Sequence, residues 1–220
     1  MLAGTVEGAP PHVKGFDINE VLTAKAARGF HERGYRFCLR YVGRKEMAKR
    51  DLSTEEAKLL LGAGLAIMPV QHVESEKAWV PTPAKGTLYG TNAGKFVKEL
   101  GFPDGVNVWL DLECVDPKVS KEDVVAYCNN WFDQVEAAGY LPGIYVGFRP
   151  ILSGEELRKR LKFRHYWGAY NVDVTIPGRG WQMKQKDVKQ LHQDDQVRVD
   201  ELGDRVHWLQ PDGWTPGPGA

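Results

Sequence analysis

The sequence predicts an α/β fold: a (β/α)8 barrel of the TIM type in which helices are missing from the last units. Two observations carry this prediction. Segments rich in apolar and aromatic residues alternate with segments of helical periodicity, and eight strand-like segments can be counted. Strict alternation of this kind favours a parallel sheet. Eight units in 220 residues lie at the lower size limit of such a barrel.

The expected strands are short and strongly apolar. They cover residues 13–18, 36–42, 65–70, 106–112, 142–147, 165–170, 180–184 and 196–201. The third has the sequence LAIMPV, an apolar run of the kind that a parallel sheet buries on both faces. No clear helix separates the last three segments, so loops are expected there. An open, doubly wound sheet is the structural alternative.

Polar caps mark where the helices begin. Asn19 is expected to cap the first helix, which Gly34 ends. Three later helices carry the signature of a capping box, a Ser followed three positions later by an acidic residue. The pairs are Ser53 with Glu56, Ser120 with Asp123, and Ser153 with Glu156. Residues 81–89 are predicted to form a loop, and residues 92–100 the helix that follows.

We expect a single domain. Residues 12–210 form the predicted barrel, residues 1–11 an N-terminal tail, and the Pro- and Gly-rich residues 211–220 a flexible C-terminal tail. The sequence contains neither a G-x-G-x-x-G fingerprint after the first strand nor a G-x-x-x-x-G-K-[ST] loop. Nucleotide-binding versions of an α/β sheet therefore lack their usual signature here.

Charge and composition limit the partners. Lys and Arg together number 29, as do Asp and Glu, so the formal net charge is zero. Bulk electrostatics therefore give no reason to expect nucleic-acid binding. No apolar run of about 18 residues is present, so no membrane insertion is expected. Residues 1–11 lack the basic and apolar regions of a secretory signal.

No cofactor and no metal site is expected. Cys38, Cys114 and Cys128 are odd in number and widely spaced, which argues against a disulfide framework and against a zinc site. The histidines show neither the H-x-H nor the H-E-x-x-H spacing, so a transition-metal hydrolase is disfavoured.

The segment WLDLE at 109–113 is the sharpest chemical feature. Residues two apart on a strand point to the same face, so Trp109, Asp111 and Glu113 share one face. Charges deep inside a barrel are costly to bury. They are tolerable at the C-terminal mouth, which is where the active sites of such barrels lie. Asp17 ends the first strand in the same way.

Asp200, in the eighth segment, is expected to complete an acidic cluster. In a closed barrel the eighth strand lies beside the first, so Asp17 and Asp200 would be neighbours, with Asp111 and Glu113 across the mouth. Glycoside hydrolysis needs one carboxyl group that delivers a proton and another that stays ionised. Crowding of like charges pushes their pKa values apart, which provides both roles.

Several other residues are candidates for substrate binding. They are Arg40 on the second strand, Tyr145 on the fifth, Trp167 and Tyr170 on the sixth, and Gln182 on the seventh. Tyr145 can hydrogen-bond a substrate, and Trp167 or Tyr170 can offer a ring face to a sugar. Arg40 can contact an anionic substrate or form a salt bridge with Asp17. Each is equally suited to a structural role in the barrel wall.

Five motifs occur in an order that resembles a known group of proteins. They are GFDIN at 15–19, WLDLE at 109–113, PGIYVG at 142–147, YWGAY at 166–170 and GWQ at 180–182. Together they resemble the glycoside-hydrolase-like domains related to family 25 glycoside hydrolases, the lysozymes or muramidases, which are barrel enzymes that cleave peptidoglycan. The resemblance covers residues 13–205. The first motif carries a single Asp, and residues 72–90 differ from the usual lysozyme connection.

The resemblance implies a role for each acid. Glu113 would be the general acid, and Asp111 the nucleophile or the carboxylate that assists the N-acetyl group of the substrate. Asp17 and Asp200 would bind substrate and tune the site. The implied activity is hydrolysis of a cell-wall glycan by a phage endolysin or a wall-remodelling enzyme, acting on an extracellular or periplasmic wall.

Two alternatives use the same cleft. A non-catalytic barrel would bind the glycan without cleaving it. A metal-dependent hydrolase of phosphate esters would need a divalent cation such as Mg²⁺ at the acidic residues. The sequence makes no prediction of oligomeric state.

Overall fold

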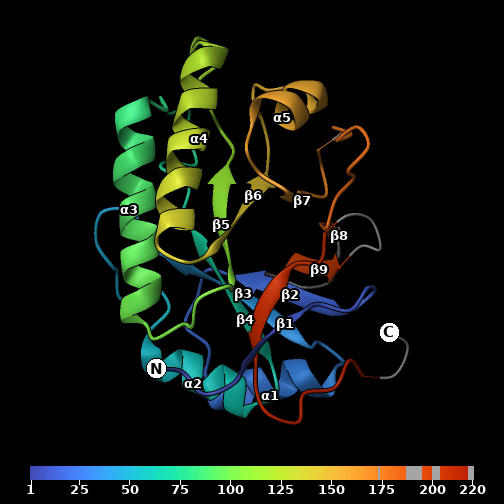
Figure 1. Cartoon of the computed structure of the whole chain (residues 1–220). Coiled ribbons are helices and arrows are strands. Elements are labelled where there is room, and N and C mark those ends of the chain that lie inside the picture. The colour runs from blue at the N-terminus through green and yellow to red at the C-terminus, as the bar shows by residue number, and fades with distance from the viewer. Residues whose placement is uncertain (173, 187–194, 200–203, 218–220) are drawn as a thin grey trace.

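Eight strands close into a barrel in the computed structural model, which describes residues 1–172, 174–186, 195–199 and 204–217 (Figure 1). The strands follow the order β4-β3-β2-β9-β8-β7-β6-β5, and β5 pairs back onto β4 to close the barrel. They are β2 (Lys14–Ile18), β3 (Phe37–Val42), β4 (Ala66–Gln71), β5 (Asn107–Leu112), β6 (Leu141–Val146), β7 (His165–Gly168), β8 (Met183–Lys186) and β9 (Asp195–Val199). The predicted α/β barrel of the TIM type is confirmed.

The last strand of the barrel departs from the prediction. Strands β2 to β8 run parallel to their neighbours, but β9 runs antiparallel to both β2 and β8. Only residues 187–194 separate β8 from β9. A crossover that returns the chain to a parallel strand takes about a dozen residues or more, so a connection this short favours an antiparallel pair. The expectation of a parallel eighth strand is therefore wrong.

Two further strands lie outside the barrel. They are β1 (Thr5–Gly8) and β10 (His207–Gln210), which pair antiparallel with each other. β10 also pairs with the beginning of β4, at Ile67, whereas β5 pairs with the end of β4, at Val70 and Gln71. β1 falls within the stretch expected to be an N-terminal tail. In the expected C-terminal tail, the indole of Trp214 donates to the carbonyl of Arg36 at 3.0 Å.

Helices within the described residues flank the barrel. They are α1 (Ala24–Glu32), α2 (Thr54–Gly62), α3 (Pro83–Glu99), α4 (Lys121–Ala137) and α5 (Gly154–Arg160). Ser53, Ser120 and Ser153 cap α2, α4 and α5, as predicted from the sequence. Asn19 does not cap α1, because the helix begins later and the side chain of Thr23 caps it instead.

Helix α3 begins within the stretch predicted as a loop, so the loop at 81–89 is wrong. The start carries a regular signal, with Thr82 as N-cap and Pro83 in the first turn. Three glycines, which lower helix propensity, obscure that signal. They are Gly86, Gly90 and Gly94. A methyl group at Gly90 would lie 2.7 Å from the carbonyl oxygen of Trp131 in α4. The glycines thus allow α3 and α4 to pack side by side (Figure 1).

Glycines also set the packing inside the barrel. Phe37 of β3 fills the space beside Gly15 of β2. Trp109 of β5 lies against Gly143 of β6, where a methyl group would approach its ring to 2.5 Å. Trp109 also meets Trp167 edge to face, with ring centroids 6.0 Å apart. These rings fill the interior, so the polar side chains are displaced toward the carboxyl ends of the strands.

Candidate active site

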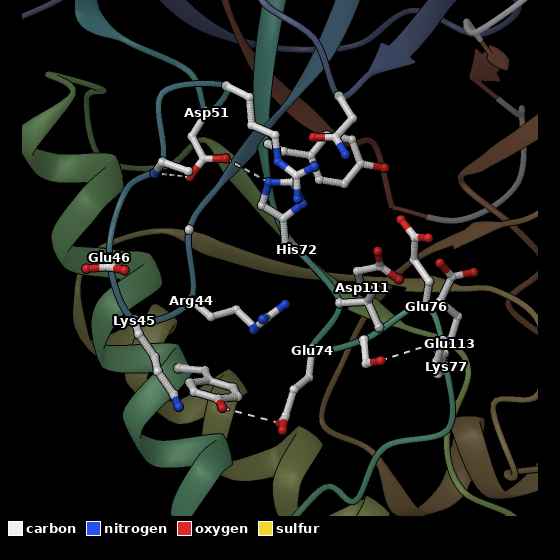
Figure 2. Close-up of a pocket in the computed structure, with 18 residues that line it drawn as sticks. Arg44, Lys45, Glu46, Asp51, His72, Glu74, Glu76, Lys77, Asp111 and Glu113 are labelled. Atoms are coloured by element: carbon white, nitrogen blue, oxygen red, sulfur yellow. Dashed lines mark hydrogen bonds and ion pairs between the residues drawn. The ribbon is translucent and has the colours of Figure 1, made fainter.

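A cavity of about 810 Å³ opens at the carboxyl ends of β3, β4 and β5 (Figure 2). Its walls come from these strand ends and from the segments 43–51 and 72–77 that follow β3 and β4. The acidic side chains that line it are Glu46, Asp51, Glu74, Glu76, Asp111 and Glu113. The basic ones are Arg44, Lys45, Arg50 and Lys77. The structure therefore brings Asp111 and Glu113 together in a cavity large enough for a sugar ring.

The carboxyl group of Asp111 is buried in this cavity. The residue is 4% exposed, and its Oδ1 has no hydrogen-bond partner among the residues that the structure describes. Burial raises its pKa well above the usual value, and the charges of Glu113 and Asp17 raise it further. The backbone N–H of Val73 and the guanidinium of Arg44 act in the opposite direction. Asp111 is therefore a carboxyl group that retains its proton more readily than an exposed one.

Glu113 directly follows β5, and contacts on several sides fix its position. Its carbonyl oxygen accepts a hydrogen bond from Nε1 of Trp79 at 2.7 Å. The next residue, Cys114, has φ of 53°, and its N–H donates to the carbonyl of Phe148 at 2.6 Å. The side chain of Glu113 lies beside Gly147, where a methyl group would approach its Cβ to 2.6 Å. These contacts hold the carboxyl group at the cavity wall.

Asp17, in β2, is linked to three other barrel strands. The hydroxyl of Tyr41 on β3 donates to Oδ2 at 3.3 Å, and Nε2 of Gln185 on β8 donates to Oδ1 at 3.2 Å. The hydroxyl of Tyr145 on β6 donates in turn to Oε1 of Gln185 at 3.0 Å. Tyr145 therefore acts on Asp17 through Gln185, a residue that is not among those predicted from the sequence.

The hydroxyl of Tyr41 interacts electrostatically with three of the predicted acids, which are Asp17, Asp111 and Glu113. Burial raises the pKa of its hydroxyl well above the usual value, and the charges of Asp17, Asp111 and Glu113 raise it further. Its ring stacks on the imidazole of His72, with centroids 4.7 Å apart. Tyr41 consequently stays protonated and serves as a hydrogen-bond donor.

His72 is itself held by Asp51, with 2.8 Å between Nε2 and Oδ1. Oδ2 of the same carboxylate accepts the N–H of Ala48 at 2.7 Å. Burial alone would raise the pKa of Asp51, but the hydrogen bonds from His72 and Ala48 lower it overall. Strand alternation could have located Tyr41, which shares a face with Leu39 of β3. No local pattern links Asp51 to His72, because only the tertiary structure brings them together.

Arg40 lies away from the cavity. It is fully buried, and its Nε and Nη2 donate to the carboxylate of Glu56 on α2 at 2.8 and 2.9 Å. Its Nη1 donates to the carbonyl of Ile18 at 2.9 Å. This placement corrects the expectation that Arg40 contacts substrate or pairs with Asp17. Alternation on β3 turns it outward, opposite to Tyr41.

Like Arg40 and Tyr145, three further predicted binding residues do not line the cavity. Trp167 is fully buried inside the barrel and packs on Tyr145, with ring centroids 4.4 Å apart. Tyr170 is 50% exposed and follows β7. Gln182 is buried, and its side chain accepts the N–H of Tyr166 at 2.7 Å. The structure thus gives Trp167 and Gln182 packing roles.

Asp200 lies outside the described residues. Its expected place beside Asp17 depended on a parallel eighth strand, and the antiparallel β9 removes that argument. In the observed register, Asp195 is the β9 residue paired with Asp17. The seventh strand was expected at residues 180–184 but forms at Met183–Lys186, so the polar partner it supplies is Gln185.

Within the described residues, no group of three or more His, Cys, Asp or Glu is placed to hold a metal ion. In the same part of the chain, no helix has the length and apolar character needed to cross a membrane. Cys38, Cys114 and Cys128 are free thiols.

One family model matches the chain over residues 28–208, and its description is Rv2525c-like, glycoside hydrolase-like domain. The match begins after Asp17 and includes Asp111 and Glu113. No curated protein sequence matches the chain significantly.

Solved structures share the fold at low sequence identity. The Tat-secreted protein Rv2525c of Mycobacterium tuberculosis, solved in complex with L-tartrate, has a TM-score of 0.63 at 16% identity over 85% of this chain and 95% of that one. A muramidase from Trichobolus zukalii has a TM-score of 0.61 at 17% identity, covering 86% and 93%. A family GH25 lysozyme from Aspergillus fumigatus has a TM-score of 0.57 at 15% identity, covering 89% and 94%. At these identities the likeness shows a shared fold.

Proposed function

The chain belongs to the family of Rv2525c-like, glycoside hydrolase-like domains, and from this premise we propose that it hydrolyses a glycosidic bond in a cell-wall-type glycan. Peptidoglycan is the substrate expected of a muramidase-like enzyme. A shared fold does not by itself imply a shared reaction, so the proposal rests on the chemistry of the site. Fold likeness to a muramidase and a lysozyme adds support without assigning a substrate.

The observation that carries the proposal is the position of Asp111 beside Glu113 in one cavity. Burial and the charge of Glu113 raise the pKa of Asp111, so the pair retains a proton at a pH where isolated carboxyl groups have lost theirs. Glycoside hydrolysis requires this combination of one proton donor and one ionised carboxylate. The arrangement therefore supports acid catalysis of glycosidic bond cleavage.

In the proposed reaction, Glu113 is the general acid and gives a proton to the glycosidic oxygen as its bond to the sugar breaks. Asp111 acts as nucleophile or assists the N-acetyl group of the substrate. Because the two carboxyl groups interact strongly, they release protons as a pair. In the free site the raised pKa places this proton on Asp111. The proposed roles therefore require that the proton passes to Glu113, which is half-buried and lines the cavity, as Asp111 ionises to act on the substrate.

Asp17 has a supporting role in this proposal. Tyr41 and Gln185 each donate a hydrogen bond to its carboxyl group, and the two bonds together hold that group in one position. A negative potential fixed in this way stabilises the positive charge that develops on the sugar ring in an oxocarbenium-like transition state.

The proposal is tested by incubating purified peptidoglycan with the protein and analysing soluble fragments by mass spectrometry. We expect the wild type to release glycan fragments and Glu113→Gln to release them about 10²- to 10⁴-fold more slowly, the usual contribution of a general acid. Glu136→Gln is the matched control, because Glu136 is an exposed acid on α4 that does not line the cavity. It should retain wild-type activity.

Two results would remove the proposal. Equal release by the wild type and Glu113→Gln would exclude Glu113 as the acid. No release, combined with saturable binding of glycan fragments, would instead identify a glycan-binding barrel that does not cleave.

A further inference from the structure

The segment between β4 and α3 contacts both acids of the cavity. Residues 72–77 of this segment line the cavity (Figure 2). Near the start of the segment, the backbone N–H of Val73 is hydrogen-bonded to the carboxyl group of Asp111. Near its end, the indole of Trp79 donates to the carbonyl of Glu113 at 2.7 Å. One short stretch of chain therefore reaches from one acid to the other.

Trp79 joins this segment to the chain that follows β5. Besides the indole bond, its backbone N–H donates to the carbonyl of Cys114 at 3.3 Å, and its carbonyl accepts the N–H of Asp116 at 2.8 Å. The two backbone bonds form a parallel β-bridge between Trp79 and Val115. Three hydrogen bonds on one residue fix the two stretches of backbone relative to each other.

The side chain of Trp79 is itself held by its surroundings. The residue is 4% exposed, and its ring meets the ring of Tyr127 on α4 edge to face, with centroids 5.2 Å apart. The ammonium group of Lys85 on α3 lies 6.0 Å from the centroid of the same indole ring. A donor on a ring that is locked by packing gives the bond to Glu113 a fixed direction.

The carbonyl that Trp79 binds belongs to the peptide group just before a strained turn. Cys114 has φ of 53°, in the left-handed region that costs energy for a residue other than glycine. Such a conformation persists only where surrounding contacts hold it. Trp79 supplies contacts on one side, and the carbonyl of Phe148 accepts the N–H of Cys114 on the other. Without the indole donor the turn can relax, and the Glu113 side chain moves with its backbone.

We propose that Trp79 is a positioning residue, which acts through the backbone of Glu113 to hold its carboxyl group at a fixed distance from that of Asp111. This inference rests on the proposed function and adds a residue that supports its acid pair. A general acid must lie within hydrogen-bond reach of the oxygen that it protonates. Trp79 does not line the cavity, so its effect falls on the rate of the reaction and not on substrate binding.

Two replacements at position 79 separate the hydrogen bond from the packing. Trp79→Phe keeps an aromatic ring and removes the N–H donor. Incorporation of 3-benzothienylalanine at position 79 keeps the bicyclic shape and replaces the N–H with sulfur, so it serves if Trp79→Phe does not fold. Trp214→Phe is the matched control. It also removes an indole bond to a backbone carbonyl, that of Arg36 at 3.0 Å, and Trp214 does not line the cavity.

Steady-state kinetics on soluble glycan fragments give the first measurement. We expect both replacements at position 79 to lower kcat by about 10- to 100-fold, the effect of a displacement of the order of 1 Å in a catalytic group. KM should stay nearly unchanged, and Trp214→Phe should keep wild-type kinetics. Equal kcat in the wild type and the position 79 variants, or a rise in KM at unchanged kcat, would overturn the inference and leave the proposed function standing.

A carbon-13 NMR titration of the Asp111 carboxyl group gives a second measurement that needs no turnover. Part of the upward shift in the pKa of Asp111 comes from the charge of Glu113. A Glu113 side chain that is no longer anchored occupies more positions, which weakens this effect. The midpoint should therefore fall toward 3.8 in both position 79 variants and stay at the wild-type value in Trp214→Phe.

An Asp111 midpoint that is the same in the wild type and in the position 79 variants would overturn the inference. An equal fall in Trp214→Phe would also overturn it, because the effect would then be general. If the wild type releases no fragments from peptidoglycan, the proposed function falls, and the midpoint of Asp111 alone decides whether Trp79 positions Glu113.

Discussion

Glu113 occupies the space that Gly147 leaves open at the end of β6. A methyl group at position 147 would lie 2.6 Å from Cβ of Glu113 and closer still to its Oε2. Side-chain Cβ atoms essentially never approach another heavy atom within 3.0 Å. Because Gly147, after β6, has no side chain, the side chain of Glu113, after the neighbouring strand β5, can lie beside it.

Gly147→Ala is expected to lower kcat by about 10- to 100-fold, because a shift of the order of 1 Å in a catalytic group has effects of this size. The melting temperature should fall as well, because the methyl group would also meet Cβ of Glu113, which moves only with its backbone, and the ring of Tyr145. Gly62→Ala is the control: no atom lies within 4 Å of the added methyl group. If the two variants are equally active, Gly147 does not position Glu113.

Asp111→Asn should stabilise the protein at neutral pH. The folded-state pKa of Asp111 is raised well above the ordinary value of 3.8, so the folded state binds the proton more tightly than the unfolded state. Stability from this group is present at pH below the unfolded pKa and is lost as the pH rises toward the folded pKa. The loss is about 1.4 kcal/mol for each unit by which the pKa is raised.

Urea denaturation of the wild type and Asp111→Asn between pH 3 and pH 8 measures this effect, a range of about 5 units around the carboxyl transition. The stability advantage of the variant should grow with pH and vanish at the acid end. If the variant is more stable by the same amount at every pH, the gain comes from packing and not from the raised pKa of Asp111.

The buried pair of Arg40 and Glu56 should be structural. Arg40→Leu is expected to cost about 3–5 kcal/mol of unfolding free energy, because it leaves the carboxylate of Glu56 buried without its partner. The double variant Arg40→Leu with Glu56→Leu should regain much of that loss. Chemical denaturation of both single variants and the double variant measures the coupling. Additive losses would show that the two groups do not depend on each other.

Tyr41→Phe removes the donor to Asp17 and keeps the ring that stacks on His72. We expect kcat/KM to fall about tenfold, the effect of one hydrogen bond to a charged group. Tyr170→Phe is the matched control, because Tyr170 is half-exposed and does not line the cavity. Steady-state kinetics on soluble glycan fragments would compare the two variants. Equal kinetics for both would remove the role assigned to Tyr41.

The first six barrel strands could be predicted because each contains a local run of apolar residues, whereas β8, with the sequence MKQK, has no such run. The six segments from the first strand to the sixth form near their expected positions, and the alternation of WLDLE places Asp111 on the face that reaches the cavity. The direction of β9 could not be predicted in this way, since it depends on the length of a connection and on the strands available for pairing. Asp200 was selected on that premise.

Other parts of the site depend on contacts between distant segments. Asp51 and His72 are 21 positions apart, and no periodic pattern relates them. Arg40 could have been assigned to the outer face of β3 by alternation, but its partner Glu56 also reads as a helix-capping residue. Local patterns therefore identify the elements and the acids on β5, whereas the hydrogen-bond partners emerge from the tertiary structure.

The most direct test is a carbon-13 NMR titration of the Asp111 carboxyl group in the wild type and in Glu113→Gln. The account predicts that Asp111 titrates well above 3.8 in the wild type, because of burial and the charge of Glu113, and at lower pH in the variant. Titration near 3.8 in the wild type, or an identical midpoint in both proteins, would contradict the shared-proton pair on which the proposed chemistry depends.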